Sequence, residues 1–142
     1  MGSKYFLVEE LVDEEVYSIL GDNAIRLLDN RLIETIDKIR EILGVPLICN
    51  NWCWGGSRDQ CGYRSVKCNI GAEKSFHKRG MAVDLISIKM SAKDMREKLD
   101  KNKHLLPYPI RIEKWDNNGE ISWLHVDVSE NTKGQKIYFF KA

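Results

Sequence analysis

The chain has 142 residues, about the length of one domain, and 43% of them are hydrophobic, so residues 1–142 are expected to fold as one unit with a buried core. Twenty-two basic and 21 acidic residues leave a net charge of +1, which excludes a whole-chain attraction to nucleic acid or to a membrane surface. No run approaches the ~20 apolar residues that span a bilayer, and the N-terminus lacks a signal-peptide core. We therefore expect a protein made in the cytoplasm without a signal peptide.

The first half of the chain contains one clear helical pattern. Apolar side chains recur at three- and four-residue steps over residues 23–43, which predicts an amphipathic helix that ends at Gly44. A short strand is expected at 46–50. Residues 51–74 lack periodicity but contain four glycines and two tryptophans, which indicates a long ordered loop. The tryptophans, Trp52 and Trp54, either wall a cleft or pack beneath this loop.

The second half of the chain contains strand-like runs and one further helix. That helix is predicted over about 92–103, with Ser91 as its N-cap. The sequence Asp-Asn-Asn-Gly at 116–119 predicts a hairpin. The predicted strands cover residues 81–88, 110–115, 120–128 and 136–140. Helices and strands mix without regular alternation, so we expect an α+β fold with a mainly antiparallel sheet flanked by helices.

Four cysteines lie within twenty residues of one another, at Cys49, Cys53, Cys61 and Cys68. Such a cluster is compatible with a zinc knot or with two disulfides. The spacing lacks the paired Cys-x-x-Cys knuckles of structural zinc sites, and the expected compartment is reducing. We therefore predict four free thiols.

A carboxylate stands inside an apolar strand at Asp84. An unpartnered buried charge loses several kcal/mol of hydration, so Asp84 needs a partner, and a cation is the simplest one. His77 can supply an imidazole from the preceding turn, with Gly80 allowing the backbone to bend between them. His125, in the later strand, can supply a third ligand. Each of these residues alone is more often structural, but together they contain two of the three histidines of the chain.

This set of side chains is typical of a catalytic zinc site. Two neutral imidazoles and one carboxylate leave the fourth tetrahedral position of Zn²⁺ open for water. A metal held in this way acidifies the water and polarises a carbonyl group, and peptide hydrolysis needs both effects.

The candidate ligands lie in two motifs, Ser75-x-His77-x-x-Gly80-x-Ala82-x-Asp84 and, about forty residues later, Trp123-x-His125-x-Asp127. They resemble the signature of the zinc D-Ala-D-Ala carboxypeptidases and their phage endolysin relatives, which share a metal site and core fold with the hedgehog signalling domain. The upstream segment CGYRSVKCN is similar to the segment that precedes the histidine motif in that family. The match covers about residues 35–128.

The resemblance implies a hedgehog-like fold in which zinc is bound by His77, Asp84 and His125. It also implies that Arg64 lies near the metal and contacts anionic or tetrahedral oxygens of the substrate. The fork of an arginine matches a carboxylate, and residues 58–79 have a local charge excess of +4. Arg58 or Arg79 could take that role if Arg64 braces the loop instead. We expect Ser75 to belong to the substrate-binding residues and to orient the turn by hydrogen bonding rather than to act as a nucleophile.

One departure from the family pattern concerns the general base. Many members carry Glu or Asp three residues before the last histidine, and this chain has Ser122 there. Three acids could take the role: Glu113, Glu120 and Asp127. Asp127 could instead hold an imidazole of the site.

We predict Glu113 as the base, because it lies in the strand that faces His125 across the hairpin. A three-residue loop at 117–119 would place Glu113 opposite Trp123, on the face of His125. A two-residue loop at 118–119 would place it opposite Leu124, on the other face.

The leading functional prediction is a monomeric zinc metallopeptidase that cuts peptidoglycan stem peptides. It would act as a D-Ala-D-Ala carboxypeptidase or as a phage-type endopeptidase that another protein releases to the cell wall. An alternative is a zinc-binding module without turnover, such as a phage virion or tail component, and Ser122 favours it. A third hypothesis is an interaction domain without metal, in which the histidines are incidental.

Overall fold

The computed structural model of the chain describes residues 2–65, 76–131 and 133–141. Its helices, with short 3-10 turns labelled η, are α1 (Val8–Leu11), α2 (Glu14–Leu20), η1 (Gly21–Leu27), α3 (Asn30–Leu43), η2 (Trp52–Trp54), η3 (Phe76–Arg79), α4 (Ala92–Lys101) and η4 (Lys103–Leu105). Its strands are β1 (Ala82–Leu85), β2 (Ile110–Asp116), β3 (Gly119–Asp127) and β4 (Ile137–Lys141). Among the described residues, no helix is both long and apolar enough to cross a membrane.

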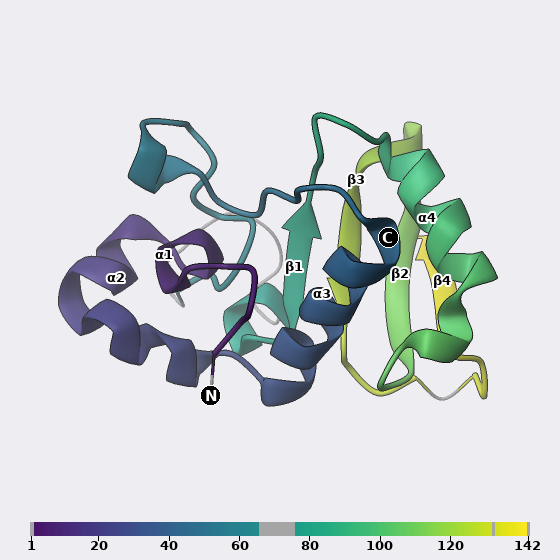
Figure 1. Ribbon diagram of the computed structural model, residues 1–142, viewed down its shortest axis with the longest axis horizontal. Helices are drawn as coiled ribbons and strands as arrows, with labels where there is room; N and C mark the ends of the chain where they lie inside the picture. The colour runs from purple at the N-terminus through teal and green to yellow at the C-terminus, as the bar shows by residue number, and fades with distance from the viewer. Residues whose placement is uncertain (1, 66–75, 132, 142) are drawn as a thin grey trace.

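The four strands form one mixed sheet in the order β1-β3-β2-β4 (Figure 1). β3 pairs antiparallel with β1 and with β2, whereas β4 at the edge runs parallel to β2. The predicted α+β class with a mainly antiparallel sheet is therefore confirmed. The parallel edge pair was not predicted, because it depends on how the chain returns after β3 rather than on the pattern within β4.

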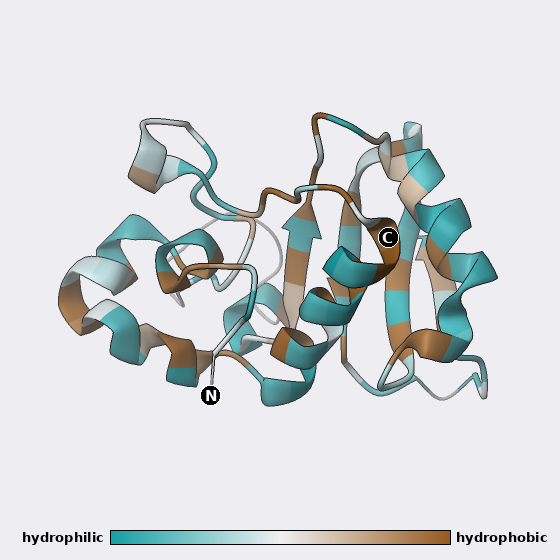
Figure 2. Ribbon diagram, viewed as in Figure 1, coloured by the Kyte–Doolittle hydropathy of each residue, from teal (hydrophilic) through white to brown (hydrophobic). Residues whose placement is uncertain are grey.

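One face of the sheet packs on α3 and α4. Figure 2 shows hydrophobic and hydrophilic residues alternating along α3, and its apolar side chains Leu32, Ile36, Ile39 and Leu43 are buried in this core. Side chains of this core that are fully buried include Leu32, Ile36, Val83, Leu99, Ile112, Leu124 and Val126. Burying each such side chain stabilises the fold by roughly 1.5–3 kcal/mol. Because side chains alternate across a strand, the residues between the core positions of β1, β2 and β3 lie on the opposite face of the sheet.

α3 is shorter than the predicted helix over 23–43. It begins at Asn30, because the carboxylate of Asp29 accepts a hydrogen bond from the Arg31 backbone N–H and caps the helix. The preceding residues form η1, whose apolar side chains continue a spacing similar to that of a helix. The predicted end is confirmed: Gly44 adopts a left-handed conformation with φ of 68° and donates its N–H to Arg40.

Three other sequence predictions need correction. The expected strand at 46–50 makes only an isolated bridge, between Ile48 and Ile86, so it is not a strand. The strand predicted over 81–88 is limited to β1, because β3 pairs with it only as far as Leu85. The helix predicted over 92–103 ends as α4 at Lys101, although its Ser91 cap is present.

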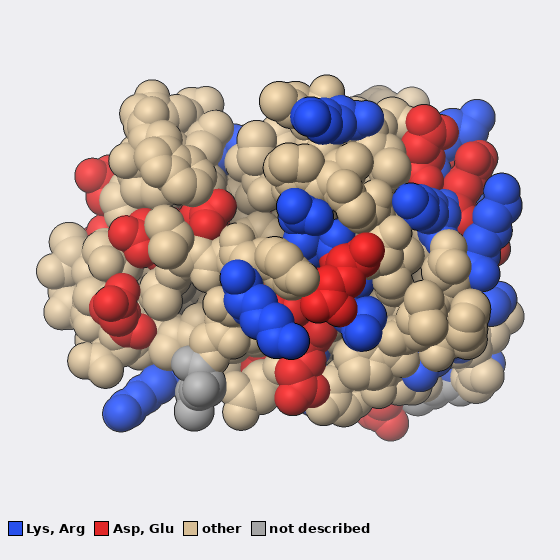
Figure 3. All heavy atoms as spheres, in the orientation of Figure 1, with Lys and Arg blue, Asp and Glu red and all other residues tan. Residues whose placement is uncertain are grey.

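The N-terminal helices α1 and α2 were not predicted. Together with η1 they form a small second cluster around Val12, Val16 and Ala24. This cluster supports the loop after residue 50, since the backbone carbonyl of Val12 accepts hydrogen bonds from the side chains of Asn50 and Trp52. Among the charged side chains that Figure 3 shows over α1 and α2, most are acidic, whereas charges of both signs lie over α3 and α4.

The two tryptophans of this loop have different surroundings. Trp52 packs beneath the loop, against the ring of Tyr17 at 5.9 Å between centroids. Trp54 is 62% exposed on the surface. The described part of the predicted loop, residues 51–65, contains no helix apart from η2. Three cysteines in the described residues, Cys49, Cys53 and Cys61, are unpaired, and Cys68 lies outside the described residues.

The β2–β3 hairpin has two registers. At its tip Asp116 pairs with Gly119 and the turn consists of residues 117 and 118, so both predicted loops were wrong. Closer to the site the register changes, and Glu113 pairs with His125. Between the two registers, only residue 114 of β2 faces residues 121–124 of β3, which form a bulge.

A buried arginine of α4 stabilises this bulge. Arg96 donates hydrogen bonds to the carbonyl oxygens of Ile121 and Trp123, at 2.9 and 3.1 Å. A bulge removes such carbonyl groups from regular strand pairing, and buried carbonyl groups without partners are costly. Arg96 therefore supports the register that places Glu113 opposite His125.

Candidate metal centre

Three charged or titratable side chains lie side by side on the face of the sheet opposite α3 and α4. His125 in β3 pairs with Asp84 in β1 on one side and with Glu113 in β2 on the other. Directly opposed residues of antiparallel strands project from the same face. The sheet thus brings together two motifs that are far apart in the sequence.

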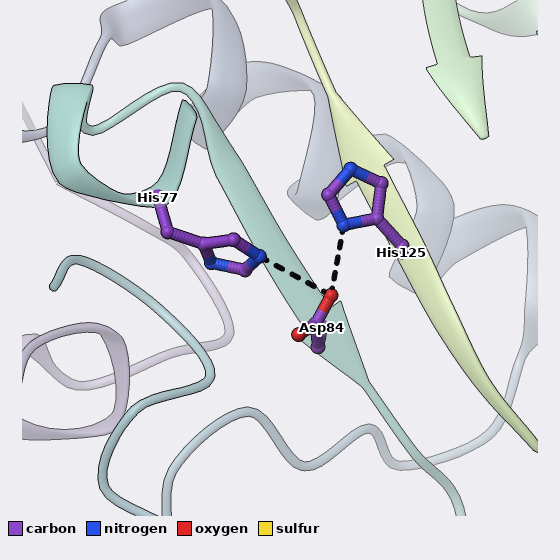
Figure 4. A group of neighbouring side chains, drawn as sticks. All are labelled: His77, Asp84 and His125. Carbon is purple, nitrogen blue, oxygen red and sulfur yellow. Dashed lines mark hydrogen bonds and ion pairs between the residues drawn. The ribbon is translucent and has the colours of Figure 1, made fainter. Parts of the chain in front are cut away.

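His77 reaches this face from η3 (Figure 4). Its Nδ1 lies 3.0 Å from the carbonyl oxygen of Gly62, and because a carbonyl only accepts, Nδ1 carries the proton. Nε2 then faces Asp84, at 3.4 Å from Oδ1. The turn after His77 depends on Gly80, which has φ of 69°, and a Cβ atom there would lie 1.8 Å from the carbonyl oxygen of Leu27.

Asp84 lies between the two histidines. Its Oδ1 is 2.9 Å from Nδ1 of His125, and its Oδ2 is 3.4 Å from Nη2 of Arg64. Burial alone would raise the pKa of the Asp84 carboxyl, but hydrogen bonds from His125 and His77 and their charges hold this pKa far below its usual range. The carboxylate is therefore ionised at all physiological pH values.

The other ring nitrogen of His125 is bound as well. Nε2 lies 2.9 Å from Oδ2 of Asp127, a carboxylate that is 0% exposed and also accepts hydrogen bonds from Ser129. Burial alone would lower the pKa of His125, but the hydrogen bonds with Asp127 and Asp84 and their negative charges raise it to about 9. Without a metal, His125 is thus an imidazolium between two carboxylates.

His77, Asp84 and His125 form a group that could hold a metal ion. One ligand atom from each residue lies within 4.8 Å of the ligand atoms of the other two. In each histidine, the ring nitrogen that does not face Asp84 is hydrogen-bonded to an oxygen, and this bond fixes the orientation of the ring, as is usual for histidines that bind metals. The residues present therefore fit a metal of the kind that nitrogen and oxygen ligands bind.

The arginines of the basic segment have different roles. Arg64 is bonded to the loop through Nε, which donates to the carbonyl oxygen of Gln60 at 2.7 Å, and it also contacts Asp84. Arg58 donates to the backbone carbonyl oxygens of Cys49 and Asp84, so it braces the backbone behind the site. Of these two, Arg64 is the one whose guanidinium contacts a carboxylate of the group. Ser75 lies outside the described residues.

The three acids considered as general base lie in different places. Glu113 is half-buried beside His125, and burial is the main cause that raises the pKa of its carboxyl. Glu120 lies near the hairpin tip and pairs with Arg96 at 3.3 Å. Asp127 is fully buried and bonded to His125 and Arg111. The structure thus brings Glu113 to the group, whereas Asp127 occupies the imidazole-holding position.

Sequence reasoning missed the environment of Asp127. Arg111 pairs with this carboxylate, and the rings of Phe76 and Phe140 lie against its guanidinium. The alternation of Arg111 and Glu113 in one strand was a signal for their common face. The aromatic partners had no such signal, because they come from segments whose position depends on the fold.

No protein-family model, curated protein or solved structure matches this chain.

Proposed function

We propose that the protein is a zinc metallopeptidase that hydrolyses peptide bonds of peptidoglycan stem peptides, with a hedgehog-like metal site. The observation that carries the proposal is the convergence of His77, Asp84 and His125, with the ring nitrogen of each imidazole that does not face Asp84 held by an oxygen. A carboxylate and two imidazoles are a ligand set of catalytic zinc sites with one open position. When bound, zinc would acidify a water molecule and polarise the scissile carbonyl.

Glu113 is the proposed proton carrier. Peptide hydrolysis requires a proton to leave the attacking water and a proton to reach the amide nitrogen. Glu113 faces the group from β2, directly opposite His125, and burial raises the pKa of its carboxyl toward the range useful for proton transfer. A carboxylate in this role contributes on the order of 10²–10⁴ in rate.

Arg64 is the proposed contact for an anionic group of the substrate. Its Nη2 lies 3.4 Å from Asp84, a long contact, while Nε is fixed by the loop. A guanidinium held in this way presents a donor beside the metal group and can bind a carboxylate. A terminal carboxylate of a stem peptide has the required chemistry. Because this substrate belongs to the cell wall, the proposal includes release of the monomeric protein to the wall, as for phage endolysins.

The test combines metal content with turnover. Purified protein should contain about one zinc per chain after reconstitution, and zinc-loaded protein should release fragments from muropeptides that chelated protein leaves intact. The absence of stoichiometric zinc would refute the metal centre. The matched variant pair is Glu113→Gln and Glu120→Gln, since only the first acid faces the group.

A second candidate function is a zinc-binding module without turnover. It is supported by Ser122, which stands where a base is usual in the family that the sequence resembles, and which is exposed on the bulge of β3. Stoichiometric zinc without hydrolysis of any muropeptide would favour this module over the enzyme.

A further inference from the structure

Asp127 is fixed by an arginine from the neighbouring strand. Arg111 in β2 pairs with Asp127 in β3, and its Nε and Nη2 lie 3.0 and 3.3 Å from the two carboxylate oxygens. This is a bidentate contact, in which the planar fork of the guanidinium sets the orientation of the carboxylate. Oδ2 of the same carboxylate meets Nε2 of His125 at 2.9 Å. The orientation of Arg111 is therefore transmitted to the imidazole through one carboxylate.

Arg111 itself is held between two aromatic rings. Its guanidinium carbon lies 4.1 Å from the ring centre of Phe140 in β4 and 5.3 Å from that of Phe76 in η3. Cations favour the faces of aromatic rings, most strongly where water is largely excluded, and the Arg111 side chain is only 23% exposed. Phe76 directly precedes His77, so the same guanidinium contacts the segment that carries the other imidazole.

We propose that Arg111 is a positioning residue for the metal group. It holds Asp127, which turns Nδ1 of His125 toward Asp84, and through Phe76 it ties η3 to the sheet beside His77. Arg111 acts through Asp127 and Phe76, so its effect on metal binding is indirect. Without the bidentate contact of the guanidinium, the imidazole of His125 could rotate, although none of the three proposed ligand residues is replaced.

The principal variant is Arg111→Lys, which keeps the positive charge but loses the planar fork. Its zinc dissociation constant, measured by competition with a chromophoric chelator, should rise about 10- to 100-fold, the usual effect of removing a partner of a metal ligand. Arg31→Lys is the matched control, because Arg31 also pairs with a carboxylate, that of Asp29, but on the exposed surface. Zinc affinity should not change in that control.

A double-mutant cycle separates this role from a general loss of stability. If Arg111 acts through Asp127, Arg111→Lys should weaken zinc binding in the wild-type background and have little further effect in an Asp127→Asn background. An equal loss in both backgrounds, or no loss in either, would overturn the proposal. If Arg111→Lys does not fold, Phe140→Leu replaces it, and unchanged zinc affinity in that variant would count against the proposal equally.

An NMR measurement on metal-free protein tests the same role of Arg111 and depends neither on zinc nor on peptidase activity. In metal-free wild-type protein, the Nε2 proton of His125 should give a resolved NMR signal protected from exchange by Asp127, and Arg111→Lys should abolish that protection. A signal equally protected in both proteins would refute the positioning role. The NMR measurement therefore tests the positioning role of Arg111 even if the protein has no peptidase activity.

Discussion

The charge of His125 makes the stability of the metal-free protein depend on pH. The pKa of His125 is about 9 in the folded protein, whereas a histidine in the unfolded chain has its ordinary pKa of 6.5. Because the folded state binds this proton more tightly, the stabilisation is fully present below about pH 6.5 and is lost as the pH rises through about 9. At about 1.4 kcal/mol per pH unit, the difference corresponds to about 3 kcal/mol.

The assay is urea denaturation of chelator-treated protein at steps between about pH 6 and about pH 10. The free energy of unfolding should fall by about 3 kcal/mol over this range, and the melting temperature by about 10 °C for a domain of this size. His125→Gln should be less stable at low pH but nearly flat over the same interval. His104→Gln, which removes an exposed histidine, should retain the wild-type slope.

Two results would refute this reasoning. Wild-type stability that is constant between about pH 6.5 and about pH 9 would mean that Asp84 and Asp127 do not hold an imidazolium between them. A decline of the same size in His125→Gln would assign the proton to another group.

The remaining predictions concern the metal, the base, the thiols and the bulge. Zinc needs deprotonated His125, so its apparent affinity should increase as the pH rises toward 9, by up to about tenfold per pH unit in chelator competition, and an affinity independent of pH would contradict this. Glu113→Gln should keep zinc but lose about 10²–10⁴ in turnover of a stem peptide, whereas turnover equal to that of Glu120→Gln would exclude Glu113 as base. A thiol reagent should count four free thiols in denatured, unreduced protein, and a count of zero would indicate two disulfides. Arg96→Met should lower the unfolding free energy by about 1–3 kcal/mol per orphaned carbonyl group, measured by urea denaturation, and an unchanged value would refute the role of Arg96 at the bulge.

The group formed by His77, Asp84 and His125 could be predicted from the sequence because its physical signal is local. Asp84 is a carboxylate in an apolar strand, and His77 and His125 lie in short motifs whose spacing survives any error in the strand ends. The pairing of Glu113 with His125 could not be predicted from the sequence in the same way. It depends on a bulge whose carbonyl groups are bound by Arg96, a residue of another element, and the composition of the turn does not reveal it.

Short elements were predicted least well. α1 has four residues and α2 has seven, which is too short for a helical period to stand out from chance. The apolar run at 46–50 has the composition of a strand but only one bridge to a neighbour, so its conformation is set by packing rather than by its own preference.

The bulge in β3 also makes the hairpin tip a place where the chain can change length. Pairing near the tip and pairing at the site follow separate registers, and the site register is fixed independently by β1 and by the bonds from Arg96. Residues inserted between Asn117 and Asn118 would therefore lengthen or remodel the tip without sliding Glu113 past His125. A peptide tag or a binding loop could be grafted at this position, and the same tolerance would let natural variants acquire new contacts there while His77, Asp84 and His125 stay in place.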